Sequence, residues 1–309
     1  MITVTNIRKT FGDFTAVNNL SFQIKPGDVV GFLGPNGAGK STTMKMLTGF
    51  LSPDSGEIRI ADMAMDESRR EIQKRIGYLP EGAPAYGDMT PIQMLNFIAD
   101  IRGLQGEHKL KRIADVIAQV QLQSVLDKPI DNLSKGFKRR VGLAQAILHD
   151  PEILILDEPT DGLDPNQKHH VRELIKNLSK DKLVIVSTHI LEEVTAVCNR
   201  AMIIAGGQML FDSTPLALQQ RSRYFQAVSL QFDAMPDVEA FKHISGVAAL
   251  ELDHENGILT LIPVQDAQEP LIEAVSRFMQ DKQLTAKAMF VEQGRLDDVF
   301  RELTEEVAA

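Results

Sequence analysis

Two short segments of the chain hold side chains suited to phosphate and metal chemistry. The first, Gly34–Thr42, reads Gly-Pro-Asn-Gly-Ala-Gly-Lys-Ser-Thr and follows the apolar run Val29–Leu33. In a strand–turn–helix context, glycines let backbone N–H groups face phosphate oxygens, and the helix N-terminus favours negative charge. We expect Lys40 to reach the outer phosphates and the Ser41 hydroxyl to meet Mg²⁺. The predicted phosphate contacts are Gly34, Asn36, Gly37, Ala38, Gly39, Lys40, Ser41 and Thr42.

The second segment is an apolar strand that ends in two carboxylates. Ile153–Leu156 runs directly into Asp157 and Glu158. A carboxylate at a strand end beside a phosphate loop suits Mg²⁺, and a neighbouring one can polarise an attacking water. We therefore expect Asp157 to bind the metal and Glu158 to act as the base. His189 follows the strand-like run Val184–Thr188, which in a doubly wound sheet places it beside the outermost phosphate.

Length and composition indicate a globular protein of about two domains. The 309 residues are 43% hydrophobic and 24% charged, and Cys198 is the single cysteine. One cysteine excludes an internal disulfide framework and suits a reducing cytosol. The N-terminal residues lack the apolar stretch of a signal peptide, and no apolar run approaches the ~18 residues that a membrane helix needs. We therefore expect a chain that does not span a bilayer.

Most of the net charge lies in the C-terminal part of the chain. The whole sequence has a net charge of −9, and residues 215–309 carry 16 acidic and 8 basic side chains. An acidic surface repels nucleic acid and anionic lipid head groups. The charge therefore argues against a nucleic-acid partner, and its simplest interpretation is a solubilising surface.

These motifs, in this order, resemble those of the ATP-binding-cassette (ABC) ATPases, over about residues 1–212. The resemblance implies ATP and Mg²⁺ as cofactors and Glu158 as the catalytic base. It also implies an α/β P-loop cassette with a mixed sheet and a helical subdomain at about residues 82–132. The matching motifs are Walker A (Gly34–Thr42), Walker B (Ile153–Glu158), the signature (Leu133–Phe137), the D-loop (Gly162–Asp164) and the switch histidine (His189).

In this family two cassettes sandwich two ATP molecules, so that Walker A of one subunit faces the signature of the other. Ser134 can cap a helix that starts at Lys135, which points its hydroxyl and the Gly136 N–H at an anion. The resemblance adds Asp164 as a contact and Phe11 as the aromatic that stacks on adenine. A core position for Phe11 is the alternative. A homodimer completes both sites, and so does a heterodimer with another cassette.

Three residues depart from the usual family motifs. The signature reads Leu-Ser-Lys-Gly-Phe instead of Leu-Ser-Gly-Gly-Gln because of Lys135 and Phe137, and Glu81 stands where the Q-loop usually has glutamine. Similar departures occur in ATPases of type-2 ABC exporters, especially gliding-motility-like members. Since a carboxylate binds Mg²⁺ more strongly than an amide does, we expect Glu81 to contact Mg²⁺ directly or through water.

Residues 90–126, between the two segments, have the pattern of helices. Thr90 can cap the first helix, with Pro91 in its first turn, and apolar residues recur at helical spacing. In the family, this helical insert and the loop after Glu81 form a groove for a permease. The resemblance therefore implies an integral membrane permease as partner and a cytoplasmic location at the inner face of the cytoplasmic membrane.

Residues 213–223 are a predicted linker to an accessory domain at 224–309. The expected order of elements in that domain is β-α-β-β-α-β, with a hairpin signal at Asn256-Gly257, which suggests a ferredoxin-like fold. Leu296–Phe300 resembles the ending of C-terminal extensions in type-2 exporter ATPases. We favour a role in dimer stabilisation or regulation, and a passive folding extension is the alternative.

The motifs favour an ATP-hydrolysing subunit that drives a separate membrane permease, with an exporter as the preferred type. A soluble ABC ATPase acting on nucleic acid or ribosomes is one alternative. Such proteins carry long coiled-coil insertions or two cassettes, whereas this chain has one phosphate loop and no sustained heptads. A low-turnover, nucleotide-gated regulatory module is the other alternative. The combination of Lys40, Asp157, Glu158 and His189 disfavours it.

Overall fold

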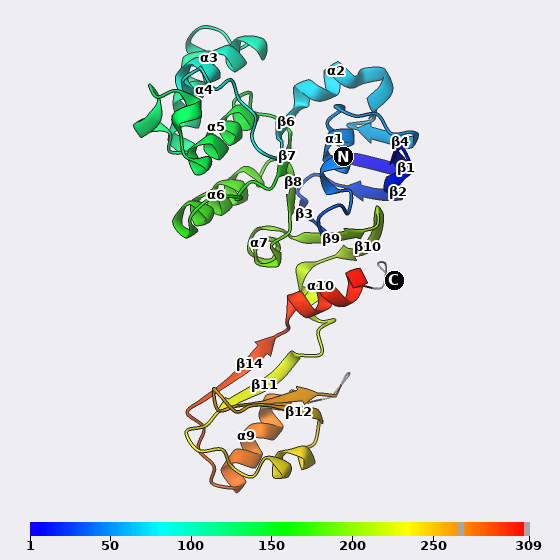
Figure 1. The fold of residues 1–309 in the computed structure, drawn as a ribbon, viewed down its shortest axis with the longest axis vertical. Helices are drawn as coiled ribbons and strands as arrows, with labels where there is room; N and C mark the ends of the chain where they lie inside the picture. The colour runs from blue at the N-terminus through cyan, green and yellow to red at the C-terminus, as the bar shows by residue number, and fades with distance from the viewer. Residues whose placement is uncertain (265–268, 306–309) are drawn as a thin grey trace. The chain divides into compact units, whose positions relative to one another are not determined.

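The computed structural model describes residues 1–264 and 269–305 (Figure 1). The chain divides into two compact units, Met1–Pro215 and Leu216–Glu305. The accessory domain was predicted to extend to residue 309, and residues 306–309 lie outside the described residues. No helix in the described part of the chain is both long enough and apolar enough to cross a membrane.

The first unit is built on a six-stranded sheet of order β10-β9-β3-β8-β7-β6. All neighbouring strands are parallel except β10, which pairs antiparallel with β9. Every residue of β3 and β7 is buried, as expected for parallel strands covered on both faces. The carboxyl ends of the parallel strands therefore meet at one edge of the sheet. The strands are β3 (Val29–Leu33), β6 (Ile76–Leu79), β7 (Ile153–Asp157), β8 (Leu183–Thr188), β9 (Arg200–Ala205) and β10 (Gln208–Ser213).

A smaller antiparallel sheet of order β2-β1-β4-β5 shares a core with the main sheet. Ile7 of this sheet, Phe32 of β3 and Met44 of the first helix belong to one buried apolar cluster. This core fixes the position of the segment between β3 and the first helix. The strands are β1 (Ile2–Phe11), β2 (Phe14–Ile24), β4 (Ser55–Ile60) and β5 (Met63–Ala64).

Helices cover the main sheet, and α3, α4 and α5 lie together at one end of the first unit (Figure 1). The predicted cap of α3 is confirmed, because the Thr90 hydroxyl accepts from the Gln93 N–H and the Gln93 side chain accepts from the Thr90 N–H. The helices are α1 (Lys40–Leu47), α2 (Met65–Arg75), α3 (Pro91–Ile101), α4 (Gly106–Gln119), α5 (Lys135–Ile147), α6 (Pro165–Leu178) and α7 (Leu191–Val197), with 3₁₀ turns at Gln123–Val125 and Ile130–Asn132.

The second unit is an antiparallel sheet of order β12-β13-β11-β14. This order and the element sequence agree with the ferredoxin-like prediction, except that the first helix is a 3₁₀ helix, η3. The predicted linker contains a short helix, α8 (Pro215–Gln219). The remaining elements are β11 (Phe225–Gln231), η3 (Val238–His243), β12 (Val247–Asp253), β13 (Ile258–Pro263), α9 (Leu271–Asp281), β14 (Ala288–Gln293) and α10 (Leu296–Glu305).

Candidate functional site

The phosphate loop joins the end of β3 to the start of α1 and lies tightly against the neighbouring backbone. Gly39, the N-cap of α1, has a φ of +100°. A Cβ on Gly39 would lie 2.3 Å from the Ala16 carbonyl oxygen, and one on Gly34 would lie 2.4 Å from that of Ile204. Both positions therefore require glycine. The same loop and the first turn of α1 contain Asn36, Gly37, Ala38, Ser41 and Thr42.

Lys40, the first residue of α1, is buried, and its ammonium group folds back over the loop. Its Nζ donates to two carbonyl oxygens of the loop, at 2.7 Å and 3.1 Å. Burial lowers the pKa of Lys40, and the carboxylates of Glu158, Asp157 and Glu81 act in the opposite direction. The predicted phosphate-binding lysine therefore lies in the electrostatic field of all three predicted acidic site residues.

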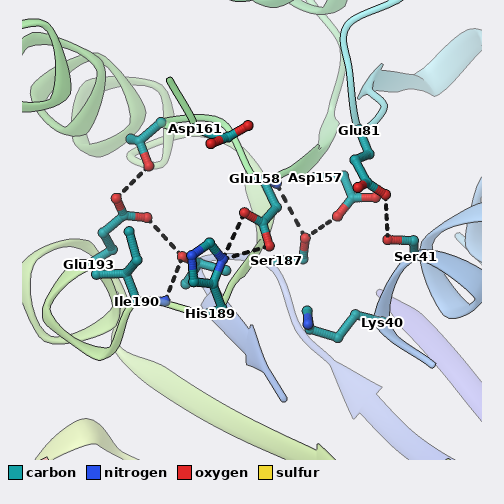
Figure 2. A network of polar contacts seen from close by, with 12 residues as sticks. Lys40, Ser41, Glu81, Asp157, Glu158, Asp161, Ser187, His189, Ile190 and Glu193 are labelled. Carbon is teal, nitrogen blue, oxygen red and sulfur yellow. Dashed lines mark hydrogen bonds and ion pairs between the residues drawn. The ribbon is translucent and has the colours of Figure 1, made fainter. Parts of the chain in front are cut away.

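Asp157 ends β7 with only one of its carboxylate oxygens hydrogen-bonded. Its side chain is 1% exposed, and the Ser187 hydroxyl on neighbouring β8 donates to Oδ1. The other oxygen, Oδ2, is buried and has no hydrogen-bond partner in the described part of the chain. Such an oxygen is costly unless something binds it. In the same region, Ser41 Oγ donates to Glu81 Oε2 at 3.4 Å (Figure 2).

Glu158 and His189 meet at the ends of β7 and β8. The His189 Nδ1 lies 2.9 Å from the Glu158 carboxylate (Figure 2). Glu158 has a φ of +52°, and its N–H donates to the Ser187 carbonyl oxygen at 3.0 Å. A non-glycine residue keeps such a backbone conformation only where its surroundings hold it. The structure thus brings the predicted base and the predicted switch histidine into direct contact.

Arg139 holds the backbone around this turn. It is 5% exposed on α5 and donates to the carbonyl oxygens of Asp157 and Glu158, as well as to that of Pro80 at 3.0 Å. A guanidinium group has five N–H donors in a planar arrangement, so one side chain can serve three carbonyls. Arg139 therefore ties α5 both to the Glu158 turn and to the segment that leads into Glu81. No sequence motif indicates this role, because all three acceptors are distant along the chain.

Ser134 and Asp164 each cap a helix. The Ser134 hydroxyl accepts from the Phe137 N–H at 3.3 Å, which confirms its predicted cap of α5, and Asp164 accepts from the Gln167 N–H at 2.9 Å at the start of α6. Gly136 is buried within α5. Among the described residues, no hydrogen bond joins Ser134, Gly136 or Asp164 to the phosphate loop. A single chain therefore does not unite these predicted contacts with Walker A.

Phe11 ends β1 and is not a core residue. Its side chain is 51% exposed, and it pairs in register with Phe14, which is 58% exposed. The Lys9 ammonium lies 5.8 Å from the centre of the Phe11 ring. The alternative of a core position is wrong, and the exposed ring has the π surface that stacking on a base requires.

Lys135, one of the unusual signature residues, pairs with a residue of its own chain. Its Nζ lies 2.8 Å from Asp161 Oδ2, and this hydrogen bond is the main cause of the lowered pKa of Asp161. A Cβ on Gly162 would lie 2.6 Å from the Lys135 side chain, so the close approach depends on glycine. The pair connects the signature helix to the D-loop segment.

Three buried polar residues complete the site and belong to none of the predicted motifs. Thr160 is 3% exposed, Thr188 is 2% exposed and Glu193 is 4% exposed. Both threonine hydroxyls donate to the Glu193 carboxylate. Their one sequence signal is polarity beside apolar strands, which is too common to single them out. Their partnership depends on how the chain folds.

Comparisons with known proteins agree with the motifs. The family model described as "ABC transporter" matches residues 17–161. The linearmycin resistance ATP-binding protein LnrL of Bacillus subtilis (strain 168) is 33% identical over 259 residues, which cover 82% of this chain and 83% of LnrL. The Nod factor export ATP-binding protein I of Burkholderia orbicola (strain AU 1054) is 36% identical over 214 residues, which cover 69% of this chain and 70% of that protein.

The fold agrees as well. The dimeric structure of a bacterial ABC transporter cassette superimposes with a TM-score of 0.66 and 25% identity, and the match covers 70% of this chain and 99% of that cassette. Sequence and fold therefore lead to the same conclusion. This chain belongs to the ABC transporter family, as a subunit that binds and hydrolyses ATP.

Proposed function

We propose that two cassettes complete the ATP site and that hydrolysis there drives a separate membrane permease, with export as the direction of transport. The observation that carries the proposal is the contact between Glu158 and His189 near Lys40 and near Asp157 Oδ2, an oxygen with no hydrogen-bond partner among the residues that the structure describes. Export is supported by relatives that are named for export or for antibiotic resistance. Binding to this permease would hold the chain at the inner face of the cytoplasmic membrane.

In the proposed reaction, Glu158 polarises the attacking water, and His189 holds the Glu158 carboxylate in position. Lys40 neutralises charge on the outer phosphates. Its ammonium group now bonds to two loop carbonyls, so ATP binding requires it to exchange these acceptors for phosphate oxygens. Phosphate oxygens are the stronger acceptors because they are charged.

Mg²⁺ fits the residues at this edge of the sheet. The buried Asp157 Oδ2, which has no hydrogen-bond partner among the described residues, is a hard oxygen ligand. The Ser41 hydroxyl donates to the Glu81 carboxylate, and Glu81 and Asp157 both act on the charge of Lys40. The described residues contain no cluster of three or more His, Cys, Asp or Glu suited to a metal. Mg²⁺ does not need one, because it usually takes one or two carboxylates, with water and substrate phosphates as its other ligands. When bound, it would neutralise charge on the phosphates.

The second cassette is proposed to be another copy of this chain. Ser134 and Gly136 lie at the N-terminus of α5, where a helix favours an anion. Because no hydrogen bond between described residues joins Ser134 or Gly136 to the phosphate loop of the same chain, the partner's ATP is their proposed ligand. Asp164 at the start of α6 and the exposed ring of Phe11 complete the proposed contacts. The related bacterial cassette forms a dimer in its solved structure.

A mostly apolar groove in the first unit is the proposed permease site. A cavity of about 1070 Å³ lies between the ATP-binding part and α3. At its mouth, Phe50 is 73% exposed and Ile101 is 64% exposed. The groove suits an amphipathic helix that carries acidic residues, since basic side chains share its lining. These are Lys45, Arg70, Lys74 and Arg102.

The second unit, in the proposed arrangement, stabilises the dimer or regulates it. Support comes from its edge strand β14, where three adjacent apolar side chains are exposed and only β11 pairs with the strand among the described residues. An edge of this kind can pair with another chain. The three residues are Met289, Phe290 and Val291.

One experiment tests the permease assignment. The chain is coexpressed with a candidate permease, a multi-helix membrane protein sought among the genes next to its own, and copurification from detergent is measured. Ile101→Glu should reduce recovery of the pair at least tenfold and leave ATP hydrolysis by the isolated subunit unchanged. Leu110→Glu is the matched control, because Leu110 is 67% exposed on α4 and does not line the groove. Equal recovery with Ile101→Glu and Leu110→Glu would overturn the assignment.

A further inference from the structure

The buried carboxylate of Glu193 joins the two chain segments that carry Glu158 and His189. Glu193 lies on α7 and is 4% exposed. Its Oε1 accepts from the Thr160 hydroxyl, and its Oε2 accepts from the Thr188 hydroxyl at 2.9 Å. Thr160 comes two residues after Glu158, and Thr188 comes directly before His189. One side chain therefore bridges the segments that bring the base and the histidine together.

Each end of this bridge also fixes the local backbone. The Thr188 hydroxyl accepts from the Ile190 N–H at 3.1 Å, so the residues on both sides of His189 are held. On the other side, the Asp161 N–H donates to the Glu158 carbonyl oxygen at 3.1 Å, which closes the turn that contains Thr160. A shift of either segment would therefore change the contact between Glu158 and His189.

A buried carboxylate is stable only with compensating partners. The Arg172 guanidinium lies 3.7 Å from Glu193 Oε1. Arg172 belongs to α6, the helix that begins after the D-loop and is capped by Asp164. Glu193 thus also connects the segment that carries His189 to α6, the helix that follows the D-loop. Within residues 1–264 and 269–305, the hydrogen-bond and ion-pair partners of Glu193 are Thr160, Thr188 and Arg172, none of which belongs to the phosphate loop.

We infer that Glu193 is a positioning residue for ATP hydrolysis. Its carboxylate holds Thr160 and Thr188 in fixed relation, and the Glu158–His189 pair keeps its geometry through them. Nucleotide binding depends on the phosphate loop, with which Glu193 makes no hydrogen bond or ion pair in the described part of the chain. Loss of the carboxylate should therefore slow hydrolysis and leave ATP affinity unchanged. This inference rests on the proposed role of Glu158 as the base.

The first test compares Glu193→Ala with Glu192→Ala. Glu192 is the matched control, since it is the neighbouring residue of the same helix and is exposed. Phosphate release is measured against ATP concentration, and folding is checked by thermal unfolding. We expect Glu193→Ala to lower kcat at least tenfold with KM within about twofold of the wild type, and Glu192→Ala to match the wild type. A folded Glu193→Ala protein with unchanged kcat would overturn the inference.

A cycle of variants separates positioning from a general loss of stability. Thr160→Val replaces the hydroxyl with a methyl group and should lower kcat on its own. Added to Glu193→Ala, it should lower kcat no further, because the hydroxyl acts through the carboxylate. Glu193→Gln should recover part of the rate, since its amide oxygen still accepts one hydroxyl. If the fold-losses in kcat caused by Thr160→Val and by Glu193→Ala multiply in the double variant, the inference is contradicted.

Failure of the inference about Glu193 can be told apart from failure of the proposed role of Glu158. If Glu193→Ala does not fold, Thr160→Val and Glu193→Gln give the answer: unchanged kcat in both would overturn the inference. If Glu158→Gln hydrolyses ATP as fast as the wild type, the proposed base is wrong, whatever the Glu193 variants do.

Discussion

The Nδ1 of His189 lies 2.9 Å from the carboxylate of Glu158, although 31 residues separate them in the chain. They meet because β7 and β8 are parallel neighbours and both side chains follow strand ends at the same edge of the sheet. Each strand places one member of the pair, and the sheet register sets the distance between them. The chemistry of the site therefore depends directly on the pairing of these strands.

The Glu158→Gln variant should hydrolyse ATP at least about 100-fold more slowly, because an amide cannot accept a proton from water and a general base contributes roughly 10²- to 10⁴-fold. ATP should still bind, since the phosphate loop is unchanged. Phosphate release measures the rate, and light scattering with ATP measures dimer formation. Hydrolysis within tenfold of the wild type would contradict the assignment of the base. No increase in scattering with ATP would contradict the homodimer.

The Glu81→Gln variant should need a several-fold higher Mg²⁺ concentration for half-maximal hydrolysis. In the wild type, the Glu81 carboxylate accepts from the Ser41 hydroxyl. A charged oxygen binds Mg²⁺ more strongly than the amide oxygen of glutamine does. Phosphate release at saturating ATP, titrated with Mg²⁺, gives the comparison. Glu107→Gln on the exposed first turn of α4 is the control. An unchanged titration curve for Glu81→Gln would remove Glu81 from the metal site.

His149 should make the first unit less stable as the pH falls below about 6.5. Burial, and then the nearby Arg102, lower the pKa of His149 from 6.5 to about 4. The unfolded chain therefore binds a proton between pH 6.5 and 4 that the folded chain does not, so the free energy of unfolding decreases through this range. The loss is at most about 3 kcal/mol.

Urea unfolding of wild type and His149→Gln at pH 7 and pH 4.5 checks this prediction. The variant should lose less stability than the wild type between the two values. His108→Gln on the exposed surface of α4 is the control and should follow the wild type. Identical losses in the wild type and in His149→Gln would show that other groups cause the pH dependence.

Phe241→Ala should destabilise the second unit by about 3–5 kcal/mol, because it removes a large buried side chain and leaves a cavity. Phe241 is 0% exposed and contacts the rings of Phe232 and Phe278. Amide exchange of β11 and β13 reports on this unit separately. Phe290→Ala, at a position 45% exposed, should change exchange far less. If Phe241→Ala and Phe290→Ala change amide exchange equally, the core of the second unit is not centred on Phe241.

Much of the fold follows from local patterns. The apolar runs before Gly34 and Asp157 are buried strands, as expected, and the predicted helix caps at Thr90 and Ser134 are present. These features depend on residues within a few positions of each other, so a sequence can specify them. The 3₁₀ form of η3 was not predicted, because helical spacing over six residues does not distinguish the two helix types.

The sequence by itself determined the nucleotide chemistry, because the phosphate loop and the strand ending in Asp157-Glu158 are continuous in the chain. Only the tertiary structure decided which distant residues support that chemistry. Arg139 reaches the carbonyls of Asp157 and Glu158 across 18 and 19 residues, and Glu193 reaches Thr160 across 33. The physical reason is that a buried charge is stabilised by whatever hydrogen-bond partners the fold places around it, acceptors for Arg139 and donors for Glu193. Spacing along the chain does not reveal those partners.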